Sequence, residues 1–408
     1  MPTLTTAEAA RRMGVKVETL YAYVSRGLLE SLPGPDGKSS RFDVRAIEEL
    51  ARRGRPRQSS RAASLNILIE TKLTSLSPQG VRYRGLSSGE LALTHTFEDV
   101  AELLWGGELP GRRAARALWN AYPLPPLPTG SATTAIGDTV RLATARLMVA
   151  SPHNGRSPDE VAAAGRMMIA TMIESLPILG DGRTPRLALP KGPPGAPPLR
   201  GTIAGRLWTR LSPRRPVPGL LPVVNAALVL MADHELAAST LAVRVAASTH
   251  ADPLATVSAG LGALSGPLHG SASSAARGLL MRAGEVGAAQ AVGEVLARRE
   301  RIPGFGHRVY ADVDPRAAVL LDMLRHAVPR SRALAVAADV QTVVHDRIGK
   351  EPNVDFALAT LAIATGMVAD GGEAIMSIAR VAGWLAHALE EFGEAPLRFR
   401  PRAHYVGR

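Results

Sequence analysis

Three histidines and one aspartate lie in short turn-like or glycine-rich segments in the second half of the chain. The segments are Ala232-Asp233-His234-Glu235, Gly266-Pro267-Leu268-His269-Gly270, Gly304-Phe305-Gly306-His307-Arg308-Val309-Tyr310 and Pro352-Asn353-Val354-Asp355-Phe356. A carboxylate can remove a proton next to a carbonyl, and a neutral imidazole can donate a hydrogen bond to the oxygen that becomes negative. These residue types therefore indicate proton abstraction from a weak carbon acid, together with polarisation of an electrophile.

The sequence excludes several other kinds of catalytic chemistry. The chain has no cysteine, which excludes thiolate chemistry and disulfides, and its sequence has neither a metal-ligand cluster nor a phosphate-binding loop. It has no uncharged apolar run of about 18 residues, so we expect no membrane span. Its first residues do not resemble a signal peptide, and the cytoplasm is the expected location.

Composition favours helices that pack through small residues. Hydrophobic residues make up 46% of the 408 residues, but aromatic residues only 4%. The length allows two or three domains. The net charge of +12 suits nucleic acid or anionic ligands. Arginines solvated on helix faces explain the same charge without any such partner, and on charge alone this is the simpler interpretation.

The sequence pattern over residues 1–52 predicts a small separate domain. A capping box at Thr5-Thr6-Ala7-Glu8 starts a first helix, and a second helix follows over Glu18–Arg26. Turn-forming residues at Leu32–Lys38 predict a hairpin wing, and Val44–Arg52 can form a third helix. The side chains expected to point inward are Leu4, Ala10, Met13, Leu20, Tyr21, Val24, Ile47 and Leu50.

This order of elements resembles the winged helix-turn-helix of the MerR and excisionase type, above all at Leu20–Leu29. The resemblance implies that the second helix enters a major groove and that the wing contacts phosphates. The implied DNA contacts are Lys16, Glu18, Thr19, Tyr21, Tyr23 and Arg26 on or beside the helix, with Lys38 and Arg41 on the wing. The alternative is a helical cap that binds protein or stabilises a dimer.

A basic linker is expected at residues 53–64. Its Arg53-Gly54-Arg55-Pro56 resembles the core of an AT-hook, although a solvated linker is the simpler interpretation. From residue 65 to residue 408 we expect a second domain. It opens with a small β element over Ile69–Gly85, and helical periodicity dominates afterwards, as in the helix that Thr96 is predicted to cap.

Residues 65–408 resemble citrate synthases. The resemblance rests on the four segments above and, in the family's order, on Arg82-Tyr83-Arg84-Gly85, Trp105-Gly106-Gly107-Glu108-Leu109-Pro110, Ala232–Ser248, Ser377–Trp384 and Arg400-Pro401-Arg402. It implies a mainly α fold with a large and a small helical domain, the small one over roughly residues 270–375. It also implies a homodimer and a condensation of acetyl-CoA with oxaloacetate that yields citrate and CoA.

The resemblance assigns a role to each candidate residue. Asp355 is the base, His269 is the neutral donor to the enolate oxygen, and His307 polarises the ketone and protonates the alkoxide. A helix starting near Ser271 would favour the neutral form of His269. The implied substrate ligands are His234, Arg316, Arg380 and, from the second subunit, Arg400. Coenzyme contacts fall on Gly304, Gly306 and Arg308, with CoA as a cosubstrate and no permanently bound cofactor.

Three positions depart from the family pattern. Met231 replaces a histidine, Ala238 replaces an asparagine, and Ser271 replaces a glycine that usually follows His269-Gly270. These changes leave open a weak enzyme, or one that takes a different 2-oxo acid or acyl-CoA. Two alternatives to a citrate synthase remain. One is a 2-methylcitrate synthase that takes propionyl-CoA, and the other is a transcription regulator that uses the synthase-like body as a metabolite sensor.

Overall fold

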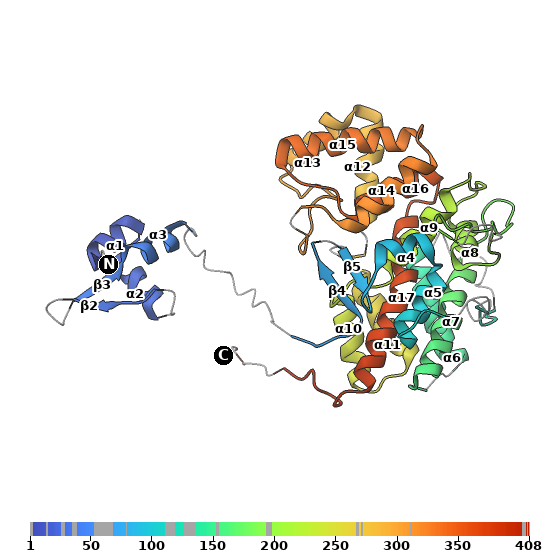
Figure 1. Ribbon diagram of the computed structural model, residues 1–408, viewed down its shortest axis with the longest axis horizontal. Coiled ribbons are helices and arrows are strands. Elements are labelled where there is room, and N and C mark those ends of the chain that lie inside the picture. Colours follow the sequence, from blue (N-terminus) through green and yellow to red (C-terminus); the bar gives the residue numbers. More distant parts are fainter. Residues whose placement is uncertain are drawn as a thin grey trace. The chain divides into compact units, whose positions relative to one another are not determined.

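The computed structural model divides the chain into two compact units, Met1–Ile69 and Glu70–Arg408, which are described separately below (Figure 1). The described residues are 3–13, 15–25, 29–34, 39–52, 68–78, 80–110, 119–125, 135–151, 155–192, 198–266, 269–270, 272–310, 312–401, 405 and 407. No described helix combines the length and the apolar character that a bilayer crossing requires.

The first unit combines three helices with a small antiparallel sheet. Its elements are β1 (Thr3–Thr5), α1 (Thr6–Met13), α2 (Val17–Ser25), β2 (Leu32–Pro33), β3 (Ser40–Asp43) and α3 (Val44–Arg52). The strand order is β1-β3-β2, so β2 and β3 form the predicted hairpin wing. The predicted capping box is confirmed: Thr5 donates from its backbone N–H and from its hydroxyl to the Glu8 carboxylate, each at 2.8 Å.

The core of the first unit corrects one part of the prediction. It consists of Ala9, Leu20, Tyr23, Leu29, Phe42, Ile47 and Leu50, with Leu4, Met13 and Val24 packed against it. Tyr23 is only 5% exposed, whereas Tyr21 is 48% exposed. The expectation that Tyr21 points inward was therefore wrong. Tyr23 packs in the core, so its predicted contact with DNA was also wrong.

The second unit is mainly helical, as predicted. Among its described residues, three strands form one antiparallel sheet in the order β4 (Thr74–Ser77), β5 (Gly80–Tyr83) and β6 (Leu86–Ser87), which confirms the small β element. The helices are α4 (Ser88–Thr94), α5 (Phe97–Gly106), α6 (Ile136–Ala150), α7 (Pro158–Glu174), α8 (Ile203–Leu211), α9 (Leu220–Met231), α10 (Ala238–Ser248), α11 (Pro253–Leu264), α12 (Ala272–Val286), α13 (Ala288–Ala297), α14 (Pro315–Ala327), α15 (Arg332–Ile348), α16 (Val354–Thr365) and α17 (Gly371–Phe392).

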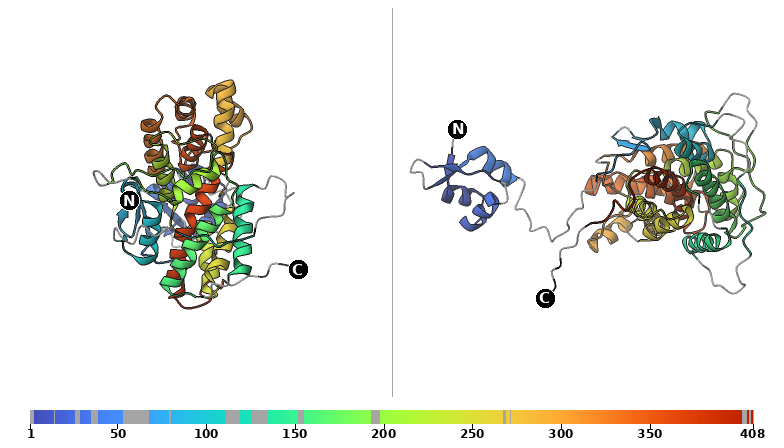
Figure 2. Two further views of the ribbon diagram at one scale, coloured as in Figure 1. Left: turned by 90° about the vertical axis from the view of Figure 1, so that its right-hand side faces the viewer. Right: turned by 90° about the horizontal axis from the view of Figure 1, so that it is seen from below.

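These helices form two groups. The long helix α17 is buried along most of its length and packs against α5, α6, α7, α9, α10 and α11 (Figure 1). Helices α12 to α16 pack on one another beside that group, as the views in Figure 2 also show. The candidate residues come from both groups, because His234 precedes α10 and Arg380 lies on α17, whereas His307 and Asp355 belong to the second group.

Small residues let the helices of the larger group approach closely. A Cβ at Gly165 of α7 would lie 2.7 Å from a Leu385 methyl and 2.8 Å from the Trp105 ring. A Cβ at Gly260 of α11 would lie 2.7 Å from Val243. These contacts are shorter than van der Waals packing allows, so the composition bias toward small residues follows from the packing.

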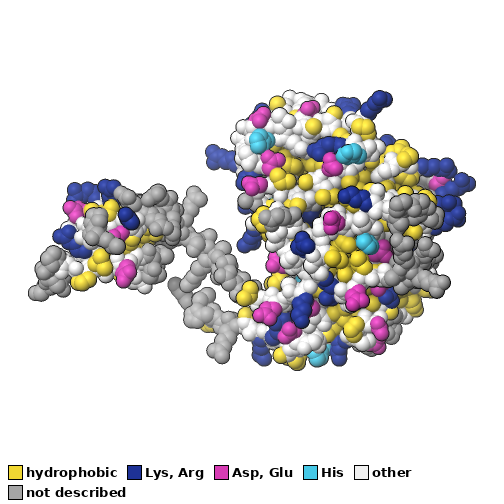
Figure 3. Space-filling model, viewed as in Figure 1, with side chains coloured by type: hydrophobic (Ala, Val, Ile, Leu, Met, Phe, Trp, Pro, Cys, Tyr) yellow, Lys and Arg dark blue, Asp and Glu magenta, His cyan; other side chains and the backbone are white. Residues whose placement is uncertain are grey.

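The face of the second unit shown in Figure 3 carries Lys and Arg side chains at many places, with acidic and apolar side chains between them. This distribution favours the interpretation of most arginines as solvated surface residues.

Candidate active site

Loops and first helical turns position the candidate residues. His234 lies between α9 and α10, His269 lies just before α12, and His307 lies in the loop before α14. Arg316 belongs to the first turn of α14, and Asp355 belongs to the first turn of α16. All three histidine residues are partly exposed, which leaves them accessible to a ligand.

His234, His307 and Arg316 meet at one place. The rings of His234 and His307 are edge to face, with centroids 5.4 Å apart. Nη2 of Arg316 lies 3.4 Å from Nε2 of His307. Burial, then Arg316 and Arg380, hold the pKa of His234 well below its usual range, so this imidazole is neutral at neutral pH.

The backbone selects the tautomer of His307. Its Nδ1 accepts hydrogen bonds from the backbone N–H groups of Val309 at 3.0 Å and Tyr310 at 3.4 Å. A neutral ring with an accepting Nδ1 carries its proton on Nε2, so the 3.4 Å contact between Nε2 and Nη2 of Arg316 is not a hydrogen bond in this tautomer. Burial and then Arg316 lower the pKa of His307, while Asp314 opposes them. His307 can therefore donate an N–H from Nε2 to a carbonyl oxygen.

Asp355 is a carboxylate with a raised pKa at the start of a helix. The residue as a whole is partly exposed, but its Oδ1 is buried and has no hydrogen-bond partner among the described residues. Burial raises its pKa to about 6, with a smaller increase from Asp314, while Arg316 and Arg380 oppose this. An unpaired carboxylate with a pKa near neutrality suits a general base.

Asn353 ties the Asp355 helix to the His307 loop. Its Oδ1 accepts from the N–H groups of Asp355 at 3.0 Å and Phe356 at 3.4 Å, which makes it the N-cap of α16. Its Nδ2 donates to the carbonyl of Gly306 at 2.9 Å, and its N–H donates to the carbonyl of Gly304 at 2.8 Å. The cap of α16 is thus Asn353, and Asp355 lies in the first turn without a capping role.

Asp314 orients Arg316. Its carboxylate accepts from Nε of Arg316 at 3.0 Å and from Nη2 at 2.8 Å, and both residues are buried. The same carboxylate accepts the N–H of Val354 at 3.0 Å. This ion pair therefore fixes the guanidinium and joins the start of α14 to the start of α16.

Arg380 adds a second buried guanidinium. It is 2% exposed, and its Nε donates to the carbonyl of Met231 at 2.9 Å. Arg380 lowers the pKa values of His234, His269 and Asp355, which places its charge near all three. Two buried guanidinium groups beside neutral imidazoles make a site for a substrate with carboxylate groups.

Ser239 holds His269. The Ser239 hydroxyl lies 2.8 Å from Nε2 of His269. The predicted helix start after His269 is confirmed, since α12 begins at Ala272. The lowered pKa of His269 nevertheless comes first from burial and then from Arg380. The glycine that follows is required, because a Cβ at Gly270 would lie 2.3 Å from the carbonyl oxygen of Leu264.

The other candidate residues lie outside this cluster. Arg308 and Arg400 are exposed. Gly304 and Gly306 have φ values of 81° and 73°, so both positions favour glycine. Met231 is fully buried, and Ala238 is the first residue of α10 behind Ala237, an N-cap residue whose side chain makes no capping bond. Ser271 lies outside the described residues.

In the first unit, Lys16, Glu18 and Tyr21 are exposed around α2, while Thr19 and Arg41 are partly exposed. These side chains are available at the surface, as DNA contacts require. Arg26 and Lys38, the other two predicted contacts, fall outside the described residues.

A buried charge network lies behind the loop that carries His234. Arg244 is fully buried and its Nη1 donates to Glu391 at 3.0 Å, its Nη2 donates to Glu390, and its Nε donates to Nδ1 of His387 at 3.1 Å. Nε2 of His387 is 3.4 Å from Oδ2 of Asp233, the residue before His234. Arg398 donates twice to Glu391, at 2.7 Å each.

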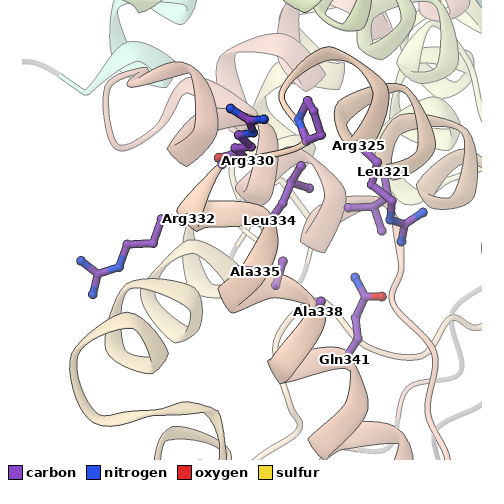
Figure 4. Close-up of a pocket in the computed structure, with 11 residues that line it drawn as sticks. Leu321, Arg325, Arg330, Arg332, Leu334, Ala335, Ala338 and Gln341 are labelled. Atoms are coloured by element: carbon purple, nitrogen blue, oxygen red, sulfur yellow. The ribbon is translucent and has the colours of Figure 1, made fainter.

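One large surface cavity is separate from these residues. It has a volume of about 390 Å³ and lies between the end of α14 and the start of α15, with Arg325, Arg330 and Arg332 among its lining residues (Figure 4). None of the histidines, nor Asp355, lines it. The cavity is therefore not the place where the clustered residues act.

Sequence reasoning missed the residues that support the site. Asp314, Ser239 and Tyr310 contact candidate residues directly, although none of them was a candidate. Asn353 had a usable signal, because an asparagine two residues before a helical Asp is a preferred N-cap. The contacts of Ser239 and Tyr310 join residues 30 and 76 positions apart, and no local pattern marks such pairs.

Comparison with known proteins gives two family matches. Residues 65–402 match the model described as citrate synthase, C-terminal domain, and residues 3–55 match a helix-turn-helix domain. Citrate synthase of Synechocystis sp. is 31% identical over 353 residues, covering 80% of this chain and 85% of that protein. The 2-methylcitrate synthase 1 of Corynebacterium glutamicum is 35% identical over 184 residues, covering 44% of this chain and 48% of that protein.

A solved structure has the same fold. It is the ternary complex of citrate synthase from Thermoplasma acidophilum with carboxymethyl coenzyme A and oxaloacetate. Its TM-score is 0.63 at 22% identity, and the match covers 84% of this chain and 94% of that one.

Proposed function

The chain belongs to the citrate synthase family, and we propose that Asp355, His269 and His307 of its second unit catalyse the condensation. The chain is an acyltransferase: it joins the acetyl group of acetyl-CoA to oxaloacetate and hydrolyses the thioester to citrate and CoA. CoA enters as a cosubstrate. The observation that carries the assignment of residues is the convergence of His234, His307 and Arg316, which Asp314 and Asn353 tie to Asp355.

The first step is removal of a methyl proton from the thioester. The Asp355 carboxylate accepts this proton, and its raised pKa gives it more basicity than an ordinary aspartate has. His269 is neutral and donates a hydrogen bond to the oxygen on which the enolate charge develops. Ser239 fixes one ring nitrogen of His269, so the other can face the thioester.

The second step is attack on the ketone. The Nε2–H of His307 donates to the ketone oxygen of the 2-oxo acid and then delivers the proton to the alkoxide. Arg316 and Arg380 bind the carboxylates of the substrate, and His234 adds a further donor. Arg400, which is exposed in its own chain, is assigned to the site of a partner subunit in a homodimer.

The test is a free-thiol release assay with oxaloacetate, run with acetyl-CoA and propionyl-CoA in parallel. Preference for acetyl-CoA supports a citrate synthase. Preference for propionyl-CoA supports the 2-methylcitrate alternative, the activity for which the Corynebacterium relative is named. Absence of thiol release with both substrates would contradict catalysis. It would leave the alternative of a regulator that senses a metabolite.

Activity is expected to rise with pH through about 6. The active form of Asp355 is the carboxylate, and its pKa is raised to about 6, so protonation abolishes the base below that pH. The pKa values of His269 and His307 are lowered, so both imidazoles stay neutral to a lower pH than an ordinary histidine does. The measurement is kcat/KM between pH 5 and 8. Constant kcat/KM down to pH 5, as expected for an unperturbed aspartate that titrates near pH 4, would contradict the raised pKa.

We assign DNA binding to the first unit. It matches a helix-turn-helix domain and has a wing, and exposed polar and aromatic side chains surround α2. Both activities can coexist in one chain, because no residue proposed for condensation belongs to the first unit. The alternative remains a helical cap that binds protein or supports the dimer.

Replacing Lys16, Glu18 and Tyr21 together by alanine is expected to lower specific DNA affinity at least about tenfold, because base contacts are lost. The probe is the DNA enriched by the wild-type chain from a random duplex library. Arg11→Ala, an exposed cation of α1, is the matched control. Unchanged affinity of the triple variant would overturn the role of α2, and failure to enrich any DNA would favour the cap.

A further inference from the structure

Tyr310 is a buried tyrosine inside the proposed site, and neither proposed step of the condensation uses its side chain. It ends the Gly304–Tyr310 segment and is 4% exposed. Its hydroxyl lies 3.1 Å from Nε2 of His234. The two rings are edge to face, with centroids 5.8 Å apart. Its hydroxyl is therefore a direct partner of a proposed substrate ligand.

Tyr310 also contacts His307 in two ways. Its backbone N–H donates to Nδ1 of His307 at 3.4 Å, next to the shorter bond from Val309. Its ring lies against the His307 ring, with centroids 4.7 Å apart at an angle of 33°. One residue thus contributes to the tautomer of His307 and limits the rotation of its ring.

Burial keeps the hydroxyl of Tyr310 neutral. Burial raises the pKa of Tyr310 to about 12, while Arg316 opposes the increase. The guanidinium of Arg316 lies 5.8 Å from the ring centroid. A neutral hydroxyl can either donate to or accept from Nε2 of His234, so it can orient that ring in either tautomer.

We propose that Tyr310 is a positioning residue for binding of the 2-oxo acid. Its hydroxyl orients His234, and its ring and N–H orient His307, so that two neutral imidazoles present hydrogen bonds to one substrate. This inference rests on the proposed function, because it assumes that both histidines face the 2-oxo acid. It assigns Tyr310 no proton transfer and no contact with the acyl-CoA.

The test is Tyr310→Phe, which removes the hydroxyl and keeps the ring. We expect KM for oxaloacetate to rise about three- to tenfold, as for the loss of one hydrogen bond, with KM for acetyl-CoA unchanged. Tyr122→Phe is the matched control, because the Tyr122 hydroxyl donates to the carbonyl of Ala150 at 2.9 Å near the surface. In ¹⁵N-histidine-labelled protein, the His234 ring signal should shift in Tyr310→Phe only.

An unchanged KM for oxaloacetate, or equal increases in both KM values, would overturn the inference. If the wild-type chain releases no thiol, the proposed function fails, and the affinity for oxaloacetate measured by calorimetry decides the role of Tyr310. Weaker binding by Tyr310→Phe than by Tyr122→Phe would still support it. Equal binding by the two variants, or no binding by the wild-type chain, would overturn it.

Discussion

Asp355→Asn is expected to reduce turnover by about 10²- to 10⁴-fold while making the second unit more stable at neutral pH. Asparagine cannot accept the methyl proton, so the base is lost. The side chain keeps its size and its place in the first turn of α16, where Asn353 still caps the helix. The affinity for oxaloacetate should change far less than turnover, because Arg316, Arg380 and His234 are untouched.

The gain in stability follows from the raised pKa. Folding moves the pKa of Asp355 from 3.8 to about 6, so the folded state disfavours the carboxylate. Above pH 6 the shift costs up to about 3 kcal/mol of unfolding free energy, at 1.36 kcal/mol for each of about two pKa units. The cost falls as the pH drops below 6 and disappears below 3.8, where the carboxyl is protonated in the folded and in the unfolded state. The neutral amide of the variant carries no such cost at any pH.

Urea unfolding at pH 7.5 and at pH 4.5 measures this difference. The chain has four tryptophans, and all of them lie in the second unit, so their fluorescence reports on that unit alone. Asp339→Asn, an exposed carboxylate on α15, is the matched control and should change neither turnover nor stability. Full turnover of Asp355→Asn would show that another group is the base.

Arg244→Met is expected to destabilise the second unit by about 3 kcal/mol. Removing one partner of a buried ion pair leaves the other charges without compensation. Arg244 is the common partner of Glu390, Glu391 and His387, and its side chain is 1% exposed. In this variant Glu391 still pairs with Arg398, and Glu390 still accepts from the hydroxyl of Thr71 and the N–H of Lys72. The expected loss of unfolding free energy is therefore at the lower end of the range for broken buried ion pairs.

Arg282→Met is the control for Arg244→Met. Arg282 forms two hydrogen bonds with Glu294, at 2.9 and 3.0 Å, but it lies on the surface. Exposed pairs of this kind contribute at most about 1 kcal/mol. Tryptophan fluorescence during urea unfolding compares the two variants. An equal effect of both would mean that burial does not strengthen the Arg244 network. Adding Glu391→Gln to Arg244→Met should recover part of the loss.

Local signals in the sequence predicted many of the elements. The capping box at Thr5 and Glu8 and the cap at Thr96 each placed a helix start correctly, and the third helix has the predicted bounds, Val44–Arg52. A capping interaction joins residues that are three or four positions apart, so a short stretch of sequence is enough to recognise it. The one misassigned face is that of α2. In a helix of nine residues, Tyr21 and Tyr23 differ by about half a turn, and both are amphipathic.

The supporting contacts of the site were beyond such reasoning. Arg244 and His387 are 143 positions apart in the sequence, and an arginine on a predicted helix by itself has the pattern of a solvated surface residue. Only the packing of α10 against α17 brings Arg244 to His387. The direction of the His269 pKa shift was foreseen, but its cause was not, because burial and the distant Arg380 are properties of the fold.

Asn353 has a mechanical consequence. It bonds to the carbonyls of Gly304 and Gly306 and also caps the helix of Asp355, so it couples the loop of His307 to the first turn of α16. A displacement of either segment that keeps these hydrogen bonds moves the other segment with it. The proposed proton acceptor and the proposed electrophile-polarising imidazole would then keep their relative positions.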